Sequence, residues 1–200
     1  MESARVANRH DLHRIAELWA DAATELDAQR GGGLLARAVL PSGSPLADLR
    51  AAHARPDDVV AVGLIDEVVV GFGYGRLRET AGERIGVIEA LYVEPEAREV
   101  GVGDAVAGVL MDHFAGLGCD GIDAFALPGN RRAKAFFEAH GFTTRLLVMH
   151  RVNRYREKDP ARTRAPAHSR APARTKASAH TPASAHTPAG GGSHTGPAGG

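Results

Sequence analysis

The sequence has few of the residues that mark several common protein classes. Its 200 residues include a single cysteine, Cys119, so an internal disulfide is excluded. No group of Cys and His residues has the spacing of a structural metal site, and no apolar run is long enough to cross a bilayer. No signal peptide is recognisable. We therefore expect a soluble, cytoplasmic protein without a bound metal.

Aromatic residues are also scarce, at 5% of the chain, and none follows Tyr155. From Arg154 onward, almost every residue is Ala, Pro, Thr, Ser, His, Gly or Arg. A segment of this composition cannot bury an apolar core. We therefore predict one folded domain over residues 1–153, followed by a disordered tail over residues 154–200.

The formal net charge of zero hides a difference between these two parts. Residues 1–153 hold 16 Lys and Arg against 22 Asp and Glu, a net charge of −6, whereas residues 154–200 hold 8 against 2, a net charge of +6. An acidic domain attracts cations, which mildly favours an amine substrate. The basic tail could bind an anionic polymer, but without aromatic residues for base stacking, nucleic acid is not favoured as a partner. A solubilising or tethering extension is the simpler interpretation.

The hydrophobic pattern predicts alternating strands and helices in the domain. Residues 4–7 fit a short strand, and the apolar stripe from Leu12 to Leu26 predicts an amphipathic helix with Asp11 as its cap. A mobile connector is expected over residues 31–45. The remaining segments are a helix (45–54), a hairpin of two strands (59–65 and 68–77), a strand (85–93), a helix (100–117), a strand (121–127), a helix (130–140) and a strand (142–152). This order indicates an α/β domain built on a mixed sheet.

A glycine-rich turn joins the strand that ends at Val93 to the next helix. Its pattern is R-x-x-G-x-G, from Arg98 to Gly103. Gly101 and Gly103 allow a pyrophosphate to approach the backbone, and the N–H groups of a helix N-terminus point toward such an anion. Arg98 could add positive charge at the rim. The turn alone also fits a tight strand-to-helix connection, and a Rossmann site is not favoured because the third glycine position holds Val106.

A second motif follows after one helix and one strand. Residues 130–142 have the sequence NRRAKAFFEAHGF, which resembles the N-x-x-A-x-x-F-Y-x-x-x-G-F helix of GNAT-superfamily N-acetyltransferases. In that family the helix follows a V-x-P-x-x-R-x-x-G-x-G turn, which residues 93–103 match, at the separation found here. The resemblance implies a GNAT-type mixed, mostly antiparallel sheet flanked by helices. In this fold two splayed parallel strands, here 85–93 and 121–127, hold acetyl-CoA or another acyl-CoA.

The resemblance also implies which residues bind the acyl-CoA. Backbone groups of the first strand bind the pantetheine arm, the turn binds the pyrophosphate, and the second motif forms the opposite wall. The implied ligands are Leu91, Tyr92, Val93, Arg98, Glu99, Val100, Gly101, Val102, Gly103, Asp104, Asn130, Ala133, Phe136 and Phe137. The implied reaction is acetylation of a primary amine, on a small molecule or a protein, by direct attack in a ternary complex.

Acetylation of an amine needs a base, because an ammonium with a pKa of about 10.4 must lose a proton before it attacks. Glu89 interrupts an apolar strand beside the implied thioester site, and small-amine GNAT enzymes are similar in carrying a carboxylate there. Glu89 is therefore the candidate base. The alternative is a carboxylate that only pairs with an arginine. Glu94 is a weaker candidate because it lies at a turn, where solvated charges are usual.

The sequence departs from the family pattern at the proton donor for the leaving sulfur. In the family a Tyr follows the Phe of the second motif, but here that position is Phe137, which cannot donate a proton. A thiol with a pKa of about 8.5 can leave as the thiolate. Tyr92 and Tyr74 are substitute donors, although tyrosines in strands are commonly packing residues. His140, at a helix end, fits a role in complementing the helix dipole better than a base.

Two further functions stay open beside the enzyme. The first is an acyl-CoA-binding sensor without turnover, which the missing tyrosine permits. The second is a domain whose basic tail recruits an acidic partner. The sequence also leaves the acceptor, the length of the acyl chain and a homodimeric state open, because in this superfamily the acceptor pocket is built from variable connectors.

Overall fold

The structure is a computed structural model that describes residues 1–39 and 44–151. Residues Met1–Leu147 form one compact unit. The predicted tail lies outside the described residues. The elements are β1 (Glu2–Val6), α1 (Leu12–Asp27), α2 (Gly32–Val39), α3 (Pro45–His53), β2 (Asp58–Ile65), β3 (Val68–Thr80), β4 (Glu83–Val93), the 3-10 helix η1 (Pro95–Ala97), α4 (Val102–Gly116), β5 (Gly121–Ala124) and α5 (Arg131–Ala139).

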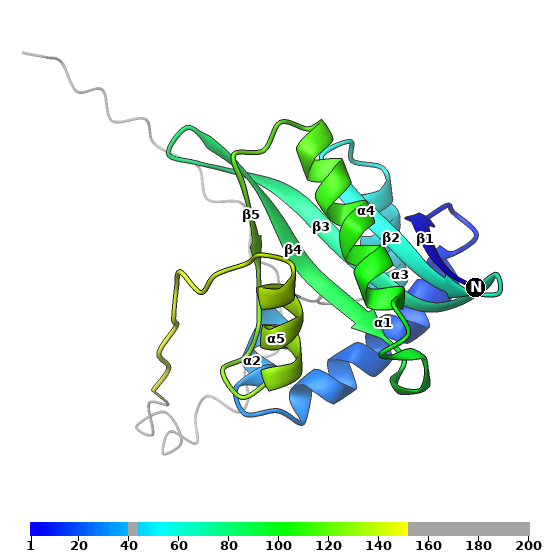
Figure 1. Ribbon diagram of the computed structural model, residues 1–200, viewed down its shortest axis with the longest axis horizontal. Helices are drawn as coiled ribbons and strands as arrows, with labels where there is room; N and C mark the ends of the chain where they lie inside the picture. The colour runs from blue at the N-terminus through cyan, green and yellow to red at the C-terminus, as the bar shows by residue number, and fades with distance from the viewer. Residues whose placement is uncertain (40–43, 152–200) are drawn as a thin grey trace, which may run out of the picture. The chain divides into compact units, whose positions relative to one another are not determined.

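The five strands form one sheet in sequence order, β1 to β5. Strands β1 to β4 are antiparallel neighbours, whereas β4 and β5 are parallel. Helix α4 lies on one face of the sheet, and α1 and α3 lie on the other (Figure 1). The predicted mixed, mostly antiparallel α/β sheet with one parallel pair is therefore confirmed.

The predicted β2/β3 hairpin is also confirmed. Ile65 lies opposite Val68 in the strand register, so Asp66 and Glu67 form the two-residue turn. Both turn residues have positive φ angles, 46° and 67°. A two-residue turn with positive φ matches the right-handed twist of the flanking strands, so it sets the pairing of β3 with β2 next to the turn.

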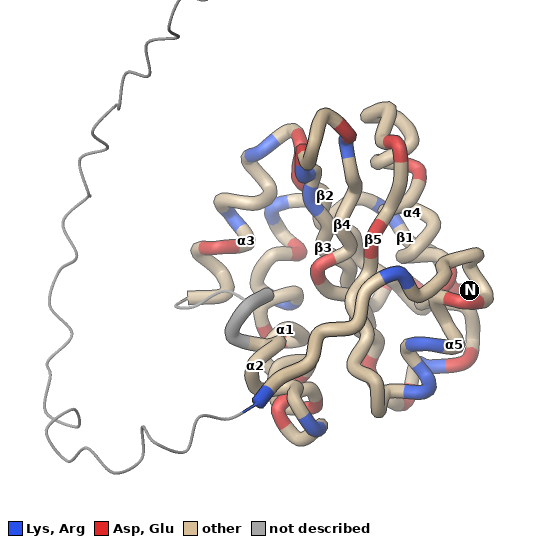
Figure 2. The backbone as a smooth tube through the Cα atoms, turned by 90° about the vertical axis from the view of Figure 1, so that its left-hand side faces the viewer, with Lys and Arg blue, Asp and Glu red and all other residues tan. Residues whose placement is uncertain are grey.

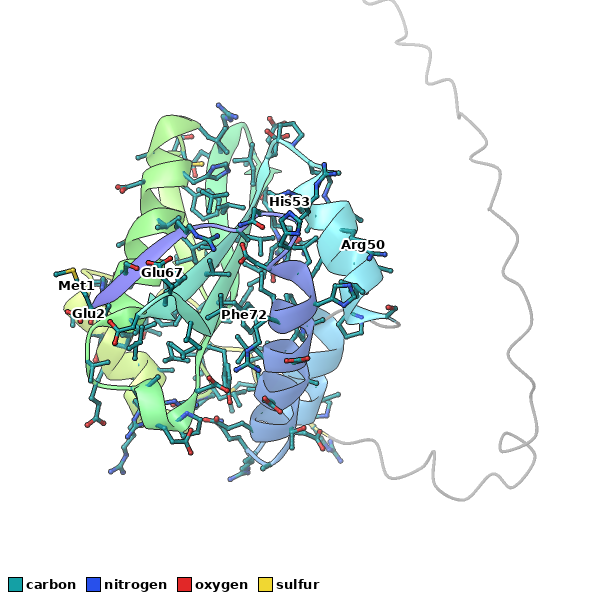
Figure 3. All side chains as sticks on the ribbon, turned by 90° about the vertical axis from the view of Figure 1, so that its right-hand side faces the viewer. Met1, Glu2, Arg50, His53, Glu67 and Phe72 are labelled. Carbon is teal, nitrogen blue, oxygen red and sulfur yellow. The ribbon has the colours of Figure 1, made fainter. Side chains whose placement is uncertain are left out.

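Each face of the sheet carries its own apolar core. Under α1, Trp19 stacks on Phe72 with ring centroids 5.1 Å apart. Phe72 is labelled beside this helix in Figure 3. Under α4, the Phe114 side chain is fully buried. A Cβ at Gly86 would lie only 2.4 Å from the Phe114 ring, so glycine at this position of β4 lets α4 approach the sheet closely. The close approach places the N-terminus of α4 near the end of β4.

The last predicted strand, residues 142–152, is not present as a strand within the described residues, so this prediction is wrong. Leu146 and Leu147 are exposed, and the segment contacts β5 through an ion pair of Arg145 with Asp123. β-propensity reflects packing on a pleated surface more than an intrinsic backbone preference. Without a hydrogen-bonded neighbour, the apolar run of this segment does not form a strand. Strand β5 is likewise shorter than predicted and ends at Ala124.

The predicted connector between the first two helices contains a helix of its own. Helix α2 begins at Gly32, although we expected the glycines at 31–33 only to interrupt the chain. The Leu127 side chain lies 3.4 Å from the Cβ position of Gly32. Leu34, Leu35 and Ala36 are favourable helix residues, and their propensity outweighs the cost of a glycine at the first position. The connector prediction is therefore wrong for residues 32–39.

Asp11 precedes α1 as predicted, but its side chain does not cap the helix. Instead, the carboxylate accepts hydrogen bonds from the Arg5 guanidinium at 2.7 and 3.1 Å and from the Asn8 backbone N–H at 2.7 Å. The Arg5 hydrogen bond, followed by that of Asn8, outweighs burial and lowers the pKa of Asp11. Asp11 therefore ties the end of β1 to the start of α1.

Replacing this carboxylate should destabilise the domain. Asp11→Asn weakens the bonds to a partly exposed arginine, so we expect a loss of about 1–2 kcal/mol in unfolding free energy at pH 7. Because the folded-state pKa of Asp11 is lowered, its contribution is present above about pH 4 and is lost as the pH falls through that lowered value. Urea unfolding at pH 7 and at pH 3 checks both points. Asp27→Asn, an exposed change on the same helix, is the control.

Candidate active site

The parallel strands β4 and β5 pair only over a short stretch. The register runs from Ile85 opposite Gly121 to Ile88 opposite Ala124, where β5 ends while β4 continues to Val93. On its other edge, β4 pairs with β3, and the register of this pair shifts next to Ile88. Tyr74 lies opposite Ala90, whereas the next residue, Gly75, lies opposite Ile88. Glu89 is therefore the extra residue of a β-bulge. Beyond this bulge, β4 has β3 as a neighbour and no longer β5.

The turn after β4 presents a row of free backbone donors. Gly101 is the N-cap of α4 with a φ of 99°, and Glu99 also has a positive φ of 68°. Among the described residues, no acceptor is recorded for the backbone N–H groups of Gly101, Val102, Gly103 and Asp104. Unpaired N–H groups at a helix N-terminus, with the positive end of the helix dipole behind them, form an anion site. The geometry therefore fits the pyrophosphate that the resemblance implies.

Arg98 is placed differently from the expected rim position. Its Nε donates to the Val93 carbonyl at 2.8 Å, and its guanidinium forms an ion pair with Glu25 of α1 at 2.6 Å. The guanidinium also lies 5.4 Å from the centroid of the Tyr92 ring. The hydrogen bond with Glu25 is the main cause that raises the pKa of Arg98. These contacts tie the turn to β4 and α1, and a direct phosphate contact by Arg98 stays a prediction.

The second motif packs against the first turn of α4. The Phe136 ring lies 3.3 Å from the Cβ position of Gly103, so this glycine makes room for an aromatic ring. His140 contacts the Phe136 carbonyl at 2.9 Å through Nδ1 and Asp104 at 3.3 Å through Nε2. The Asn130 side chain caps α5 by accepting from the Ala133 N–H at 3.0 Å. The structure therefore brings together the two motifs that are separated in the sequence.

Helix α5 also brings positive charge to the turn, which the sequence analysis did not anticipate. Arg132 forms an ion pair with Glu99 at 3.0 Å. Lys and Arg positions are visible along α5 in Figure 2. The signal in the sequence is the basic run Arg131-Arg132-Ala133-Lys134 directly after Asn130. Phe137, on the same helix, packs against Phe142 with ring centroids 5.3 Å apart.

Glu89 is buried and held by two arginines. Its side chain is 1% exposed, and its Oε1 accepts from Arg76 Nε and from an Arg78 guanidinium N–H, both at 2.6 Å. Its Oε2 is buried and has no hydrogen-bond partner among the described residues. Sequence reasoning missed both arginines. The available signal was their spacing of two on β3, which places them on one face of the sheet.

The two candidate tyrosines differ in their surroundings. The Tyr74 hydroxyl donates to Asp58 at 3.0 Å and is therefore already engaged. Tyr92 packs near Phe72, with ring centroids 6.3 Å apart. Burial, followed by the nearby Glu25 carboxylate, raises the pKa of Tyr92, so its hydroxyl keeps its proton at neutral pH.

Burial also raises the pKa of the Cys119 thiol, and this side chain packs against the core under α4.

Two further observations concern only the described part of the chain. No three His, Cys, Asp or Glu side chains within residues 1–39 and 44–151 lie close enough together to hold a metal ion. In the same ranges, no helix combines the length and apolarity needed to span a membrane.

Comparisons with known proteins agree with this geometry. The chain matches the model of the acetyltransferase (GNAT) family over residues 9–142. Similar solved structures include a tetramutant of a Bacillus halodurans protein, with 20% identity and a TM-score of 0.63 over 75% of this chain and 99% of that chain. They also include the aminoglycoside N-acetyltransferase AAC(6')-Iy in complex with CoA, with 18% identity and a TM-score of 0.60 over 77% of this chain and 95% of that chain.

A third similar structure is glucosamine-6-phosphate N-acetyltransferase from Arabidopsis thaliana, with 18% identity and a TM-score of 0.57 over 76% of this chain and 98% of that chain. At these identities the structural similarity shows the fold alone. No curated protein matches the sequence significantly. The family model, in contrast, spans about two thirds of the chain and includes both the glycine turn and the second motif. The chain therefore belongs to the GNAT acetyltransferase family.

Proposed function

We propose that this protein transfers an acetyl group from acetyl-CoA to a primary amine, by direct attack in a ternary complex. The observation that carries the proposal is the row of unpaired N–H groups from Gly101 to Asp104, located where β4 continues beyond the end of β5. An anionic cofactor can bind this row through its pyrophosphate. The cytoplasmic location expected from the sequence is part of the same proposal.

The residues near this row can hold acetyl-CoA as a substrate. The edge of β4 that no longer pairs with β5, at Leu91, Tyr92 and Val93, can bind the pantetheine amides. The turn from Arg98 to Asp104 can bind the pyrophosphate. Helix α5 packs against the turn and supplies the second wall, through its N-cap residue Asn130 and through Ala133, Phe136 and Phe137. The Asn130 carbonyl oxygen is used in the cap, so its NH₂ group is the part available to a ligand.

The acceptor ammonium loses two protons overall, one to a base before the attack and one as the amide forms, and the leaving sulfur gains one. The amine nitrogen forms a bond to the thioester carbonyl carbon while the carbon–sulfur bond breaks. Glu89 takes the proton that the ammonium loses, directly or through a water molecule, and Oε2 is the oxygen without a competing hydrogen bond. Tyr92, whose hydroxyl is protonated at neutral pH, can donate a proton to the leaving sulfur, and the second proton that the nitrogen loses as the amide forms replaces it.

A second candidate function is an acyl-CoA sensor with little or no turnover. Two observations favour it: Phe137 replaces the family tyrosine and is packed against Phe142, and Glu89 is already paired with two arginines. Calorimetry with acetyl-CoA and an assay of CoA thiol release over a panel of amines separate the two functions. An enzyme binds acetyl-CoA and releases thiol only when a suitable amine is present. A sensor binds acetyl-CoA and releases no thiol with any amine.

The domain boundary near residue 153 makes a separate prediction. Deleting residues 154–200 should leave the melting temperature and the affinity for acetyl-CoA near their original values, because beyond Tyr155 the removed segment has no large apolar side chain to anchor it on the domain. Differential scanning fluorimetry and calorimetry measure both quantities. A melting temperature lowered by many degrees would show that the segment stabilises the domain and that the boundary is misplaced.

A further inference from the structure

The cluster around Glu89 has more positive than negative charge. Arg76 and Arg78 both donate to the same oxygen, Oε1, at 2.6 Å. One carboxylate therefore faces two guanidinium groups, and the three side chains together carry a net charge of +1. The other oxygen, Oε2, is buried without a hydrogen-bond partner within the described residues.

The acidic residue opposite Arg76 on strand β2 does not cancel this excess. Asp58 of β2 lies opposite Arg76 in the strand register. Its carboxylate accepts from Arg55 at 2.8 Å and from the Tyr74 hydroxyl at 3.0 Å. Arg55 therefore balances the charge of Asp58, and the excess at Arg76 and Arg78 remains. This local charge is opposite to the net charge of −6 over residues 1–153.

Both arginines keep N–H donors that have no acceptor within residues 1–39 and 44–151. Arg76 bonds Glu89 through Nε alone, and Arg78 does so through one terminal nitrogen alone. Their side chains are 40% and 44% exposed, so the remaining N–H groups can be reached by a ligand. A guanidinium edge with free N–H groups matches the oxygens of a carboxylate or a phosphate and can bind them in a bidentate manner.

We propose that Arg76 and Arg78 form an anion subsite of the acceptor pocket, and that the acceptor is a small amine carrying a carboxylate or a phosphate on the same molecule. The inference rests on the proposed function, because Glu89 places the amine beside the arginines. In such an acceptor the ammonium donates to Glu89 Oε2 while the anionic group binds the free guanidinium donors. Such a ligand supplies a donor for Glu89 Oε2 at one end and an acceptor for the free arginine N–H groups at the other.

Matched acceptor pairs test this assignment. The carboxylate arm compares phenylalanine with phenylalaninamide and phenethylamine, and the phosphate arm compares glucosamine 6-phosphate with glucosamine. For the wild type we expect the anionic member of one arm to have a kcat/KM at least about tenfold above its neutral partner, the effect of one charge-assisted hydrogen bond. The arm that shows the preference identifies the anion.

Variants show whether the arginines cause the preference. Two single variants, Arg76→Gln and Arg78→Gln, each leave one guanidinium on Glu89. In each variant, the kcat/KM for the anionic acceptor divided by that for its neutral partner should fall toward one. Arg50→Gln removes an exposed arginine of α3 that points away from the sheet (Figure 3) and should keep the wild-type ratio. Equal kcat/KM within both wild-type pairs, or a preference that survives both single substitutions, overturns the subsite.

A binding measurement keeps this test separate from that of the proposed function. If no amine is acetylated, the proposed function fails, and calorimetry with each acceptor in the presence of CoA still decides the subsite. Binding of an anionic member but not of its neutral partner, lost in Arg78→Gln, supports the subsite without catalysis. Equal binding of both members, or binding of neither, contradicts it.

Discussion

Gly101→Asp should abolish CoA binding while the domain stays folded. The carboxylate would lie at the N-cap of α4, beside the free N–H groups of Gly103 and Asp104. Its negative charge would repel a pyrophosphate from these groups. The positive φ of 99° at this position costs about 1–2 kcal/mol for a residue with a Cβ, a cost that a folded domain can tolerate. Calorimetry with CoA should show at least a hundredfold loss of affinity, about 2.7 kcal/mol.

Gly101→Asn separates charge from shape in this experiment. Asparagine has nearly the same size and also tolerates positive φ, but it carries no charge. We expect it to weaken CoA binding by about tenfold or less, because it adds a side chain beside the N–H groups without repelling phosphate. A folded Gly101→Asp protein with unchanged affinity would remove the phosphate assignment of the turn.

Glu89→Gln is expected to lower kcat by about a hundredfold or more, in line with general-base contributions, with little change in acetyl-CoA affinity. The side chain keeps its size, and a neutral Oε1 can still accept from Arg76 and Arg78, so the fold should persist. If Glu89 accepts the amine proton, the deficit in kcat should shrink as the pH rises, because the free amine then forms without help. Steady-state kinetics over a pH series measure this dependence.

Glu94→Gln is the matched control for this variant. Glu94 also pairs with an arginine, Arg14 at 2.7 Å, but it is partly exposed and lies outside the proposed site. Its substitution should leave kcat near the wild-type value. If Glu89 only positions the acceptor, Glu89→Gln should instead raise the acceptor KM and leave kcat nearly intact. Wild-type kinetics at every pH would assign Glu89 a structural role as the partner of the two arginines.

The cofactor side of the site follows closely from local sequence. The turn from Arg98 to Gly103 has the conformation that its glycines suggest, with a left-handed residue at Gly101 and free N–H groups beyond it. These features depend on the backbone, and backbone conformation at a glycine turn is decided by a few neighbouring residues. The family resemblance adds the contact between the two motifs, which spacing alone does not specify.

The acceptor side could not be predicted in the same way. The pairing of Glu89 with Arg76 and Arg78 depends on the register between β3 and β4, and this register shifts at a bulge that no local signal marks. Helix α2 was missed for another reason, because it begins at Gly32 and glycine is a poor helix residue. The absence of the predicted last strand also could not be read from local sequence. The apolar run at Leu146 and Leu147 forms a strand only where a neighbouring strand supplies hydrogen bonds.

The central claim is that this chain acetylates an amine with acetyl-CoA bound at the glycine turn. The most direct test incubates the protein with acetyl-CoA and a broad amine panel, and measures free CoA thiol and acetylated amine in the same samples. We predict equal amounts of both products for at least one amine with the wild type, and neither product above background with Gly101→Asp. Absence of acetylated amine across the panel, with acetyl-CoA demonstrably bound, would contradict the enzyme assignment and favour the acyl-CoA sensor.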